Sequence, residues 1–141
     1  KLSAQGVTVI VPVYNEERGV EGVFERLSKV DLGAPVELLA INDGSKDRTG
    51  EKLAALARRL PNLRIVTHRS NMGYGAALKT GFTHAKHAIV VITDADGTYP
   101  EDRIRDLLDC IDDGAEMAVG ARLGANVSIP LLRWFGVDAG P

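Results

Sequence analysis

The sequence has little cysteine, no long apolar run and no large excess of either charge, and each of these features argues against a class of protein. A single cysteine, Cys110, cannot form an intramolecular disulfide framework, so the chain fits a reducing compartment. The longest apolar runs, Val7–Tyr14 and Ala88–Thr93, are far shorter than the roughly 18 residues of a membrane span. A net charge of -2 argues against a general nucleic-acid binder, which is usually basic. We therefore expect a cytoplasmic protein.

The chain does contain an alternation of two hydrophobic periods within 141 residues, the length of one ordinary domain. Val7–Val13 is a near-continuous β-branched run, typical of a strand buried on both faces. Apolar residues at helical spacing follow within Glu16–Val30. Strands are expected at Val7–Val13, Pro35–Ile41, Leu63–Thr67, Ala88–Thr93 and Glu116–Gly120. Helices are expected at Glu16–Val30, around Leu53–Leu60, at Gly75–Lys86 and around Ile104–Ile111. This order predicts an α/β fold, with a mainly parallel sheet covered by helices on both faces.

The position of a ligand site follows from this fold class. In open parallel sheets, ligands bind beyond the carboxyl ends of the strands, where the strand order reverses. The candidate segments are therefore those that follow each predicted strand: Tyr14–Arg18, Asn42–Thr49, His68–Gly75, Asp94–Pro100 and the residues from Ala121 onward.

Two carboxylates, Asp94 and Asp96, directly follow the predicted strand Ala88–Thr93. They would repel each other at this position unless a cation or a proton lies between them. Carboxylate oxygens suit hard divalent ions such as Mg²⁺ or Mn²⁺, which often join protein carboxylates to substrate phosphates. The alternative is a helix start, because Thr98 and Glu101 have the spacing of a capping box. That alternative leaves Asp94 and Asp96 unexplained.

The loops after the first two predicted strands allow both a binding and a purely structural interpretation. Asn42–Thr49 is suited to holding a ligand, but also to a plain turn whose Asp and Ser side chains cap the next helix. Asn15 has the position of a cap for the helix expected from Glu16. Tyr14 is suited either to stacking on a base or to simple packing.

The glycine-rich segment Asn71–Gly81 is close to two phosphate-binding patterns and matches neither. Leu78 stands where a dinucleotide fingerprint needs glycine or alanine, and where a P-loop needs glycine before Lys79. A flexible turn at a helix start remains, whose exposed amides are suited to meet an anion. The histidines, which lack metal-ligand spacing with any cysteine, are His68, His84 and His87.

Taken in order, these segments resemble the motifs of one enzyme family. They read VTVIVPVYNEE at 7–17, INDGSKDRT at 41–49, NMGYG at 71–75 and TDADG at 93–97. Together they resemble family-2 glycosyltransferases, which have the Rossmann-like GT-A fold of nucleotide-diphospho-sugar transferases. The VGAR element at 119–122 is similar to that of the branch that includes dolichol-phosphate mannose synthase.

The resemblance implies a role for each matching residue. Pro12, Tyr14 and Glu16 would line the nucleotide pocket, and Asp43 would accept a hydrogen bond from the base. The other residues implied in binding are Gly44, Asn71, Gly73 and Arg133. The residues implied in catalysis are Asp94, Asp96 and Arg122, of which the two aspartates would hold Mg²⁺ or Mn²⁺ and Arg122 would bind phosphate.

Two positions depart from the family pattern. Asn42 stands where the family usually has aspartate, which removes one negative charge near the nucleotide. Thr98 stands where close relatives often have glutamine, so the metal would have fewer protein ligands or Thr98 would only cap a helix.

The implied reaction is an inverting transfer of a hexosyl group from a UDP-, GDP- or dTDP-linked sugar to an acceptor, polyprenyl phosphate above all. A phosphate oxygen is already anionic at neutral pH, so such an acceptor needs no general base. The alternatives are a nucleotide-sugar-binding domain without catalysis and a cell-wall or polysaccharide glycosyltransferase with a sugar acceptor. No nucleic-acid partner is expected.

The same resemblance divides the chain. Residues 1–122 form the expected nucleotide-sugar-binding core, and 123–141 begin an acceptor-side loop that the family usually continues. Within that loop, Ile129–Phe135 is amphipathic and is suited either to lie at a membrane surface or to cover the edge of the sheet. The first interpretation would place the cytoplasmic protein at the inner face of the membrane, and the second would not.

Overall fold

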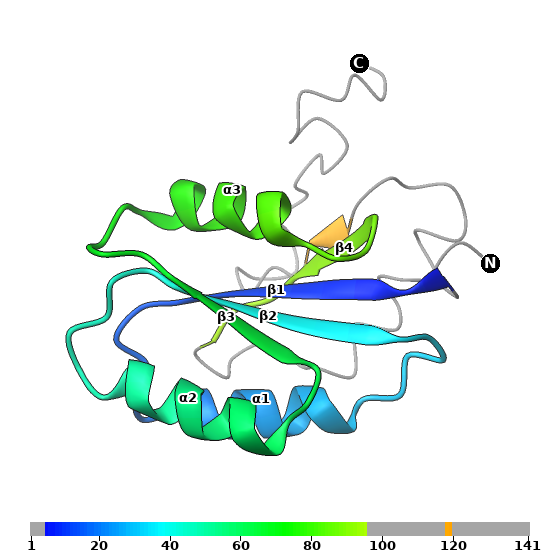
Figure 1. Cartoon of the computed structure of the whole chain (residues 1–141), viewed down its shortest axis with the longest axis horizontal. Coiled ribbons are helices and arrows are strands. Elements are labelled where there is room, and N and C mark those ends of the chain that lie inside the picture. The colour runs from blue at the N-terminus through cyan, green and yellow to red at the C-terminus, as the bar shows by residue number, and fades with distance from the viewer. Residues whose placement is uncertain (1–4, 96–117, 120–141) are drawn as a thin grey trace, which may run out of the picture.

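The computed structural model describes residues 5–95 and 118–119, which form a parallel sheet between helices (Figure 1). The elements are β1 (Val7–Val13), α1 (Val20–Lys29), β2 (Val36–Asn42), α2 (Thr49–Arg59), β3 (Leu63–Thr67), α3 (Tyr74–His84), β4 (Ile89–Ile92) and β5 (Ala118–Val119). The predicted α/β class is confirmed. The helix expected around Ile104–Ile111 lies outside the described residues.

The strands pair in the order β3-β2-β1-β4-β5, and every pair is parallel. The chain therefore builds outward from β1 through β2 to β3, and then crosses to the other side of β1 to form β4. The strand order reverses at β1, which is the position where a parallel α/β sheet binds ligands beyond its carboxyl edge.

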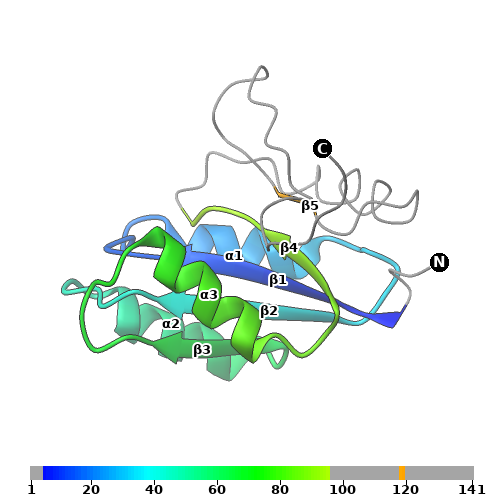
Figure 2. The same cartoon turned by 90° about the horizontal axis from the view of Figure 1, so that it is seen from above.

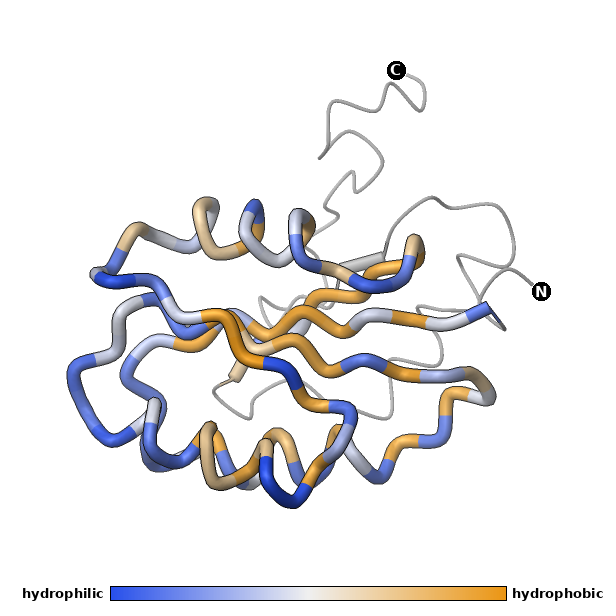
Figure 3. The backbone as a smooth tube through the Cα atoms, in the orientation of Figure 1, coloured by the Kyte–Doolittle hydropathy of each residue, from blue (hydrophilic) through white to orange (hydrophobic). Residues whose placement is uncertain are grey.

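Helices cover both faces of the sheet, with α1 and α2 on one face and α3 on the other (Figures 1 and 2). Alternate residues of β1 enter different cores, because successive side chains of a strand point to opposite faces. Val9 and Val11 pack in the core shared with α1 and α2, whereas Ile10 packs with Leu78 of α3. Figure 3 shows the consequence, a layer of hydrophobic strands between helices that carry polar residues.

The packing of α3 on β1 depends on Gly81. A Cβ atom added to this residue would lie 2.7 Å from Cγ2 of Ile10, which is too close for any side chain at a fixed backbone position. The small residue therefore lets α3 approach the sheet directly. Within the described residues, no helix has both the length and the apolar character needed to cross a bilayer.

The first helix begins later than predicted. It starts at Val20 rather than near Glu16, and the N-cap position is Gly19, with no capping bond from a side chain. A turn precedes the helix, because the carbonyl of Glu16 accepts hydrogen bonds from the amides of Gly19 and Val20. The interpretation of Asn15 as the cap of this helix is therefore wrong.

At the amino ends of the strands, Glu37 is a buried carboxylate with every oxygen bonded. Its Oε1 accepts from the Thr8 hydroxyl at 2.9 Å and from the Lys86 amide at 2.8 Å. Its Oε2 accepts from Arg64 Nη1 at 2.6 Å. Burial raises the pKa of Glu37, but these hydrogen bonds lower it further than burial raises it, so the pKa is lowered overall.

Candidate functional site

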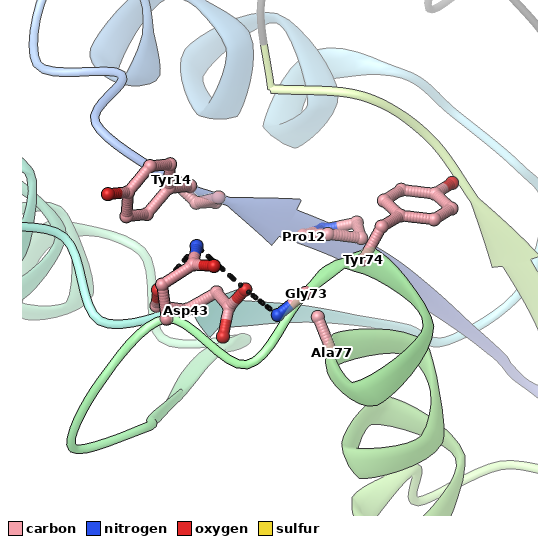
Figure 4. Close-up of a pocket in the computed structure, with 8 residues that line it drawn as sticks. Pro12, Tyr14, Asp43, Gly73, Tyr74 and Ala77 are labelled. Carbon is pink, nitrogen blue, oxygen red and sulfur yellow. Dashed lines mark hydrogen bonds between the residues drawn. The ribbon is translucent and has the colours of Figure 1, made fainter.

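A pocket of about 400 Å³ opens at the carboxyl edge of the sheet, beside β1. That volume lies within the range of sites for small molecules. The lining residues come from the end of β1, from the residue after β2 and from the segment around the start of α3: Pro12, Val13, Tyr14, Asp43, Asn71, Gly73, Tyr74 and Ala77. Figure 4 shows the Tyr14 and Tyr74 rings at opposite ends of the pocket, with Pro12 between them.

Asp43 organises the floor of this pocket and is only 4% exposed. Its Oδ1 accepts from the Met72 amide at 2.9 Å and lies 2.7 Å from His68 Nδ1. Its Oδ2 accepts from the Gly73 amide at 2.9 Å and from Asn71 Nδ2 at 3.2 Å. A carboxylate offers about four acceptor positions, and all of them are in use here. Residues 68–73, called the 68–73 loop below, are therefore held around the Asp43 carboxylate by these hydrogen bonds.

The hydrogen bonds to Asp43 also set its charge. Burial raises the pKa of this carboxyl, but the bonds from His68 and from the amides of Met72 and Gly73 outweigh that effect, so the pKa is lowered. Asp43 is consequently ionised at neutral pH and acts only as an acceptor. The prediction that it accepts from a nucleotide base stays a prediction, and such a bond would have to replace one of these four.

Acid is expected to destabilise the protein through Asp43 and Glu37. Both carboxyls have a lowered pKa in the folded state, so each stabilises the fold above its unfolded pKa, and that stabilisation is lost as the pH falls through the folded value. Urea denaturation should give a constant contribution above about pH 5 and a declining free energy of unfolding below about pH 4. A free energy that rises or stays level between pH 5 and pH 3.5 would contradict this expectation.

The loops after β1 and β2 are tied together by Asn15. Its φ of 49° lies in the left-handed region, which asparagine tolerates better than most residues. In this conformation the Asn15 amide donates to Ser45 Oγ at 2.9 Å, and Asn15 Oδ1 accepts from the Lys46 amide at 2.9 Å. Asn42, at the end of β2, accepts from the Ser45 amide at 3.2 Å. Asn15 thus joins two loops rather than starting a helix.

Thr49 and Asp47 continue the same connection. The Glu16 amide donates to Thr49 Oγ1 at 2.8 Å, and the Glu17 amide donates to Asp47 Oδ2 at 3.3 Å. Asp47 Oδ1 accepts from the Thr49 amide at 2.9 Å. The N-cap position of α2 is nevertheless Arg48, with no capping bond from a side chain, so the interpretation of an Asp or Ser side chain as the cap of this helix is wrong. The bonds from the Glu16 and Glu17 amides fix the backbone that leads from Pro12 and Tyr14 into α1.

Gly44 makes the contact between the loop after β2 and the 68–73 loop. Its φ is 72°, and a Cβ atom there would overlap the backbone of Ser70 and lie 2.5 Å from the Asn71 nitrogen. Gly44 does not line the pocket. Its lack of a side chain lets the 68–73 loop, which carries the lining residues Asn71 and Gly73, pack against the loop after β2.

The structure places the residues predicted from the sequence in three groups. Those that line the pocket are Pro12, Tyr14, Asp43, Asn71 and Gly73. Those described but not among its lining residues are Glu16, Gly44 and Asp94. Those outside the described residues are Asp96, Arg122 and Arg133.

Two further residues belong to the site and were not predicted from the sequence, Tyr74 and His68. Tyr74 is 52% exposed and lines the pocket. The signal in the sequence was an aromatic residue within the NMGYG motif, in a loop that follows a predicted strand. His68 follows β3 with no recognisable spacing, so only the folded chain shows its contact with Asp43.

Asp94 follows β4 and is half-buried, two positions beyond the last strand residue. The neighbouring Thr93 amide donates to the carbonyl of Ile10 at 3.0 Å, which fixes this segment against β1. Across residues 5–95 and 118–119, no three His, Cys, Asp or Glu side chains are grouped as metal ligands. The donor type still fits a hard divalent ion, because Asp94 provides carboxylate oxygen.

A parallel sheet that reverses its strand order at β1, with a pocket beyond the carboxyl edge of that strand, defines a doubly wound α/β protein with a small-molecule site. The sequence profile of glycosyl transferase family 2 matches residues 8–135, and the chain belongs to that family. Its fold is GT-A.

Among curated relatives, the chain is 33% identical to a dolichol-phosphate mannosyltransferase of Pyrococcus furiosus, over 82% of this chain and 33% of that protein. It is 37% identical to a polyprenol monophosphomannose synthase of Mycolicibacterium smegmatis, over 84% of this chain and 45% of that protein. The chain thus spans between a third and just under half of the length of these relatives.

A solved structure supports the same grouping. The mannosyltransferase PcManGT from Pyrobaculum calidifontis, in complex with GDP-Man and Mn²⁺, superposes with a TM-score of 0.69 and 32% identity. The similarity covers 77% of this chain and 33% of that one.

Proposed function

We propose that the protein transfers a hexosyl group, with inversion, from a nucleotide-diphospho-sugar to polyprenyl phosphate, and that the described residues hold the nucleotide. The observation that carries this proposal is the pocket beside β1, which has an aromatic ring at each end and a buried carboxylate at its floor. Aromatic rings stack on bases, and a polar floor orients them. The relatives named for polyprenyl-phosphate products and the GDP-Man complex support the choice of donor and acceptor.

Tyr14 and Tyr74 are the groups expected to hold the base. They are 42% and 52% exposed, so each ring can offer a face to a ligand without leaving a core. Pro12 and Ala77 add apolar surface to the lining of the pocket. The proposed part of these residues in the reaction is therefore to fix the nucleoside beside β1.

Asp94 and Asp96, which follow β4 in the chain, would hold Mg²⁺ or Mn²⁺. A divalent ion bound there would neutralise charge on the departing nucleoside diphosphate, an effect worth several kcal/mol. Arg122 and Arg133, which lie outside the described residues, are proposed to bind the acceptor phosphate, since a guanidinium matches phosphate oxygens. An acceptor phosphate is anionic at neutral pH, so this site needs no general base.

Thermal unfolding in the presence of donors tests the proposal. GDP-mannose, UDP-glucose and a dTDP-sugar should be compared with and without Mn²⁺. At 100 times its dissociation constant, the true donor should add about 2.7 kcal/mol of stability, a shift of several degrees in the melting temperature. Pyrophosphate with Mn²⁺ is the control for metal–diphosphate binding without a nucleoside. No shift with any donor in a folded sample would contradict the proposal.

Two variants distinguish a residue that lines the pocket from an exposed neighbour that does not, with donor affinity as the measurement. Tyr14→Ala should weaken donor binding about tenfold by removing a stacking surface. Met72→Ala is the matched control, because Met72 is 63% exposed beside the pocket but does not line it. Transfer of radiolabelled sugar to a polyprenyl phosphate, to a sugar acceptor or to water then separates the proposed transferase from a polysaccharide-type enzyme and from a binding domain without catalysis.

A further inference from the structure

His68 occupies a bridging position between the sheet, the pocket and α3. It follows β3 directly, and its side chain is 10% exposed. Its amide donates to the carbonyl of Asn42 at 2.9 Å, which continues the pairing of β3 with β2. Its Nδ1 lies 2.7 Å from Asp43 Oδ1, and its Nε2 lies 2.7 Å from Thr80 Oγ1 of α3. His68 is therefore held by hydrogen bonds at both ring nitrogens and at its backbone amide.

The chemistry of the partners sets the direction of these bonds. Asp43 is ionised and can only accept, so His68 Nδ1 carries the hydrogen and donates it. The other ring nitrogen, Nε2, bonds the Thr80 hydroxyl, which serves as donor or acceptor according to whether Nε2 carries a hydrogen. A chain of hydrogen bonds thus runs from Thr80 through His68 to Asp43.

This chain of bonds ends at the backbone of the pocket wall. Asp43 Oδ1, which receives the His68 bond, also accepts from the Met72 amide, and Oδ2 accepts from the Gly73 amide. The bond from His68 therefore fixes the rotation of the carboxylate at which both amides point. Asn71 and Met72 have exposed side chains, so the loop has little packing of its own and depends on these inward bonds.

We infer that His68 is a positioning residue that holds the Asp43 carboxylate in the orientation that fixes the 68–73 loop as the wall of the pocket. The inference deepens the proposed function, on which it rests for the meaning of that wall as a nucleotide contact. A histidine suits the position because its rigid ring bonds Asp43 and Thr80 at the same time, one through each nitrogen. A flexible amide cannot satisfy both partners.

Two variants separate the two ends of the imidazole. The amide nitrogen of His68→Asn can replace Nδ1 and keep the bond to Asp43, whereas the amide of His68→Gln reaches the position of Nε2 and keeps the Thr80 side. The readout is backbone amide exchange in the ligand-free protein, measured by NMR. His68→Gln should speed exchange of the Met72 and Gly73 amides by about tenfold or more, and His68→Asn by about threefold or less. His84→Gln, an exposed histidine on α3, is the control and should change neither.

The outcomes are distinct. Equal acceleration in His68→Asn and His68→Gln would overturn the inference, because the bond to Asp43 would then be irrelevant. Acceleration of the Ile10 and Leu39 amides in the sheet to the same extent would also overturn it, because the role would then be general stability. GDP-mannose with Mn²⁺ is then titrated into each variant, and about tenfold weaker binding by His68→Gln alone would extend the role to the ligand. Absence of binding in every variant and in the wild type would count against the proposed function and leave the exchange result to decide the role of His68.

Discussion

Gly44→Ala should destabilise the protein by about 3 kcal/mol or more. A positive φ costs a residue with a Cβ atom about 1–2 kcal/mol, and Gly44 has a φ of 72°. The added methyl would also overlap the backbone of Ser70, and a clash of this kind costs about 1–3 kcal/mol more. Because a backbone cannot move aside as a side chain can, the 68–73 loop should be displaced. The measurement is the midpoint and slope of urea denaturation, together with donor affinity.

Gly75→Ala is the matched control for this change. Gly75 lies in α3, has an ordinary φ, and a Cβ atom there would meet nothing within 4 Å. Alanine is a better helix former than glycine by about 0.8–1.0 kcal/mol in a helix interior, so this variant should be neutral or slightly stabilised. Similar behaviour of the two variants would refute the importance of the contact between Gly44 and the 68–73 loop.

Asp43→Asn should cost about 3 kcal/mol of stability and most of the donor affinity. Asparagine has one accepting oxygen, so two of the four donors around Asp43 would lose their acceptor. Each buried group left unpaired costs about 1–3 kcal/mol, and the amide would also point its own hydrogens at the others. Urea denaturation at pH 7 measures the difference in stability between the variant and the wild type. This difference should shrink as the pH falls from about 4 through the lowered pKa of Asp43, because the wild-type carboxyl becomes protonated over that range.

Asp31→Asn makes the same chemical change at an exposed aspartate, whose carboxylate accepts a hydrogen bond from the Gly33 amide at 2.8 Å. Its effect should stay within about 0.5 kcal/mol. A loss of stability in Asp31→Asn as large as that in Asp43→Asn would indicate a general charge effect and refute the local explanation.

The strands of this protein could be predicted from the sequence because burial on both faces leaves a continuous apolar signal. Val7–Val13 was predicted with the bounds that β1 has, and Leu63–Thr67 with those of β3. The start of α1 was not predictable, because the deciding event is the left-handed conformation of Asn15, which is set by Ser45 and Lys46 from another loop.

The candidate site shows the same division. Pro12, Asp43 and Gly73 were predicted because they lie in family motifs at the ends of strands or after them, and in the structure all three line one pocket. The partners of Asp43 could not be found from local spacing, since they lie 25 to 30 residues away in the chain. His68 carries no pattern of its own, and its importance arises only where β2, β3 and α3 meet.

The central position of β1 also has a consequence for how the chain folds during synthesis. Val7 of β1 pairs with Val36 on one edge of the strand and with Ile89 on the other. Because β1 is synthesised before β4, its second edge stays unpaired until β4 has been made. Parallel strands cannot pair through a short hairpin. At about 5–20 residues per second, β1 therefore has unpaired backbone N–H and C=O groups along one edge, beside its apolar side chains, for several seconds. Nascent chains of this protein should be most prone to aggregation, and most in need of a holding chaperone, in the interval before β4 emerges.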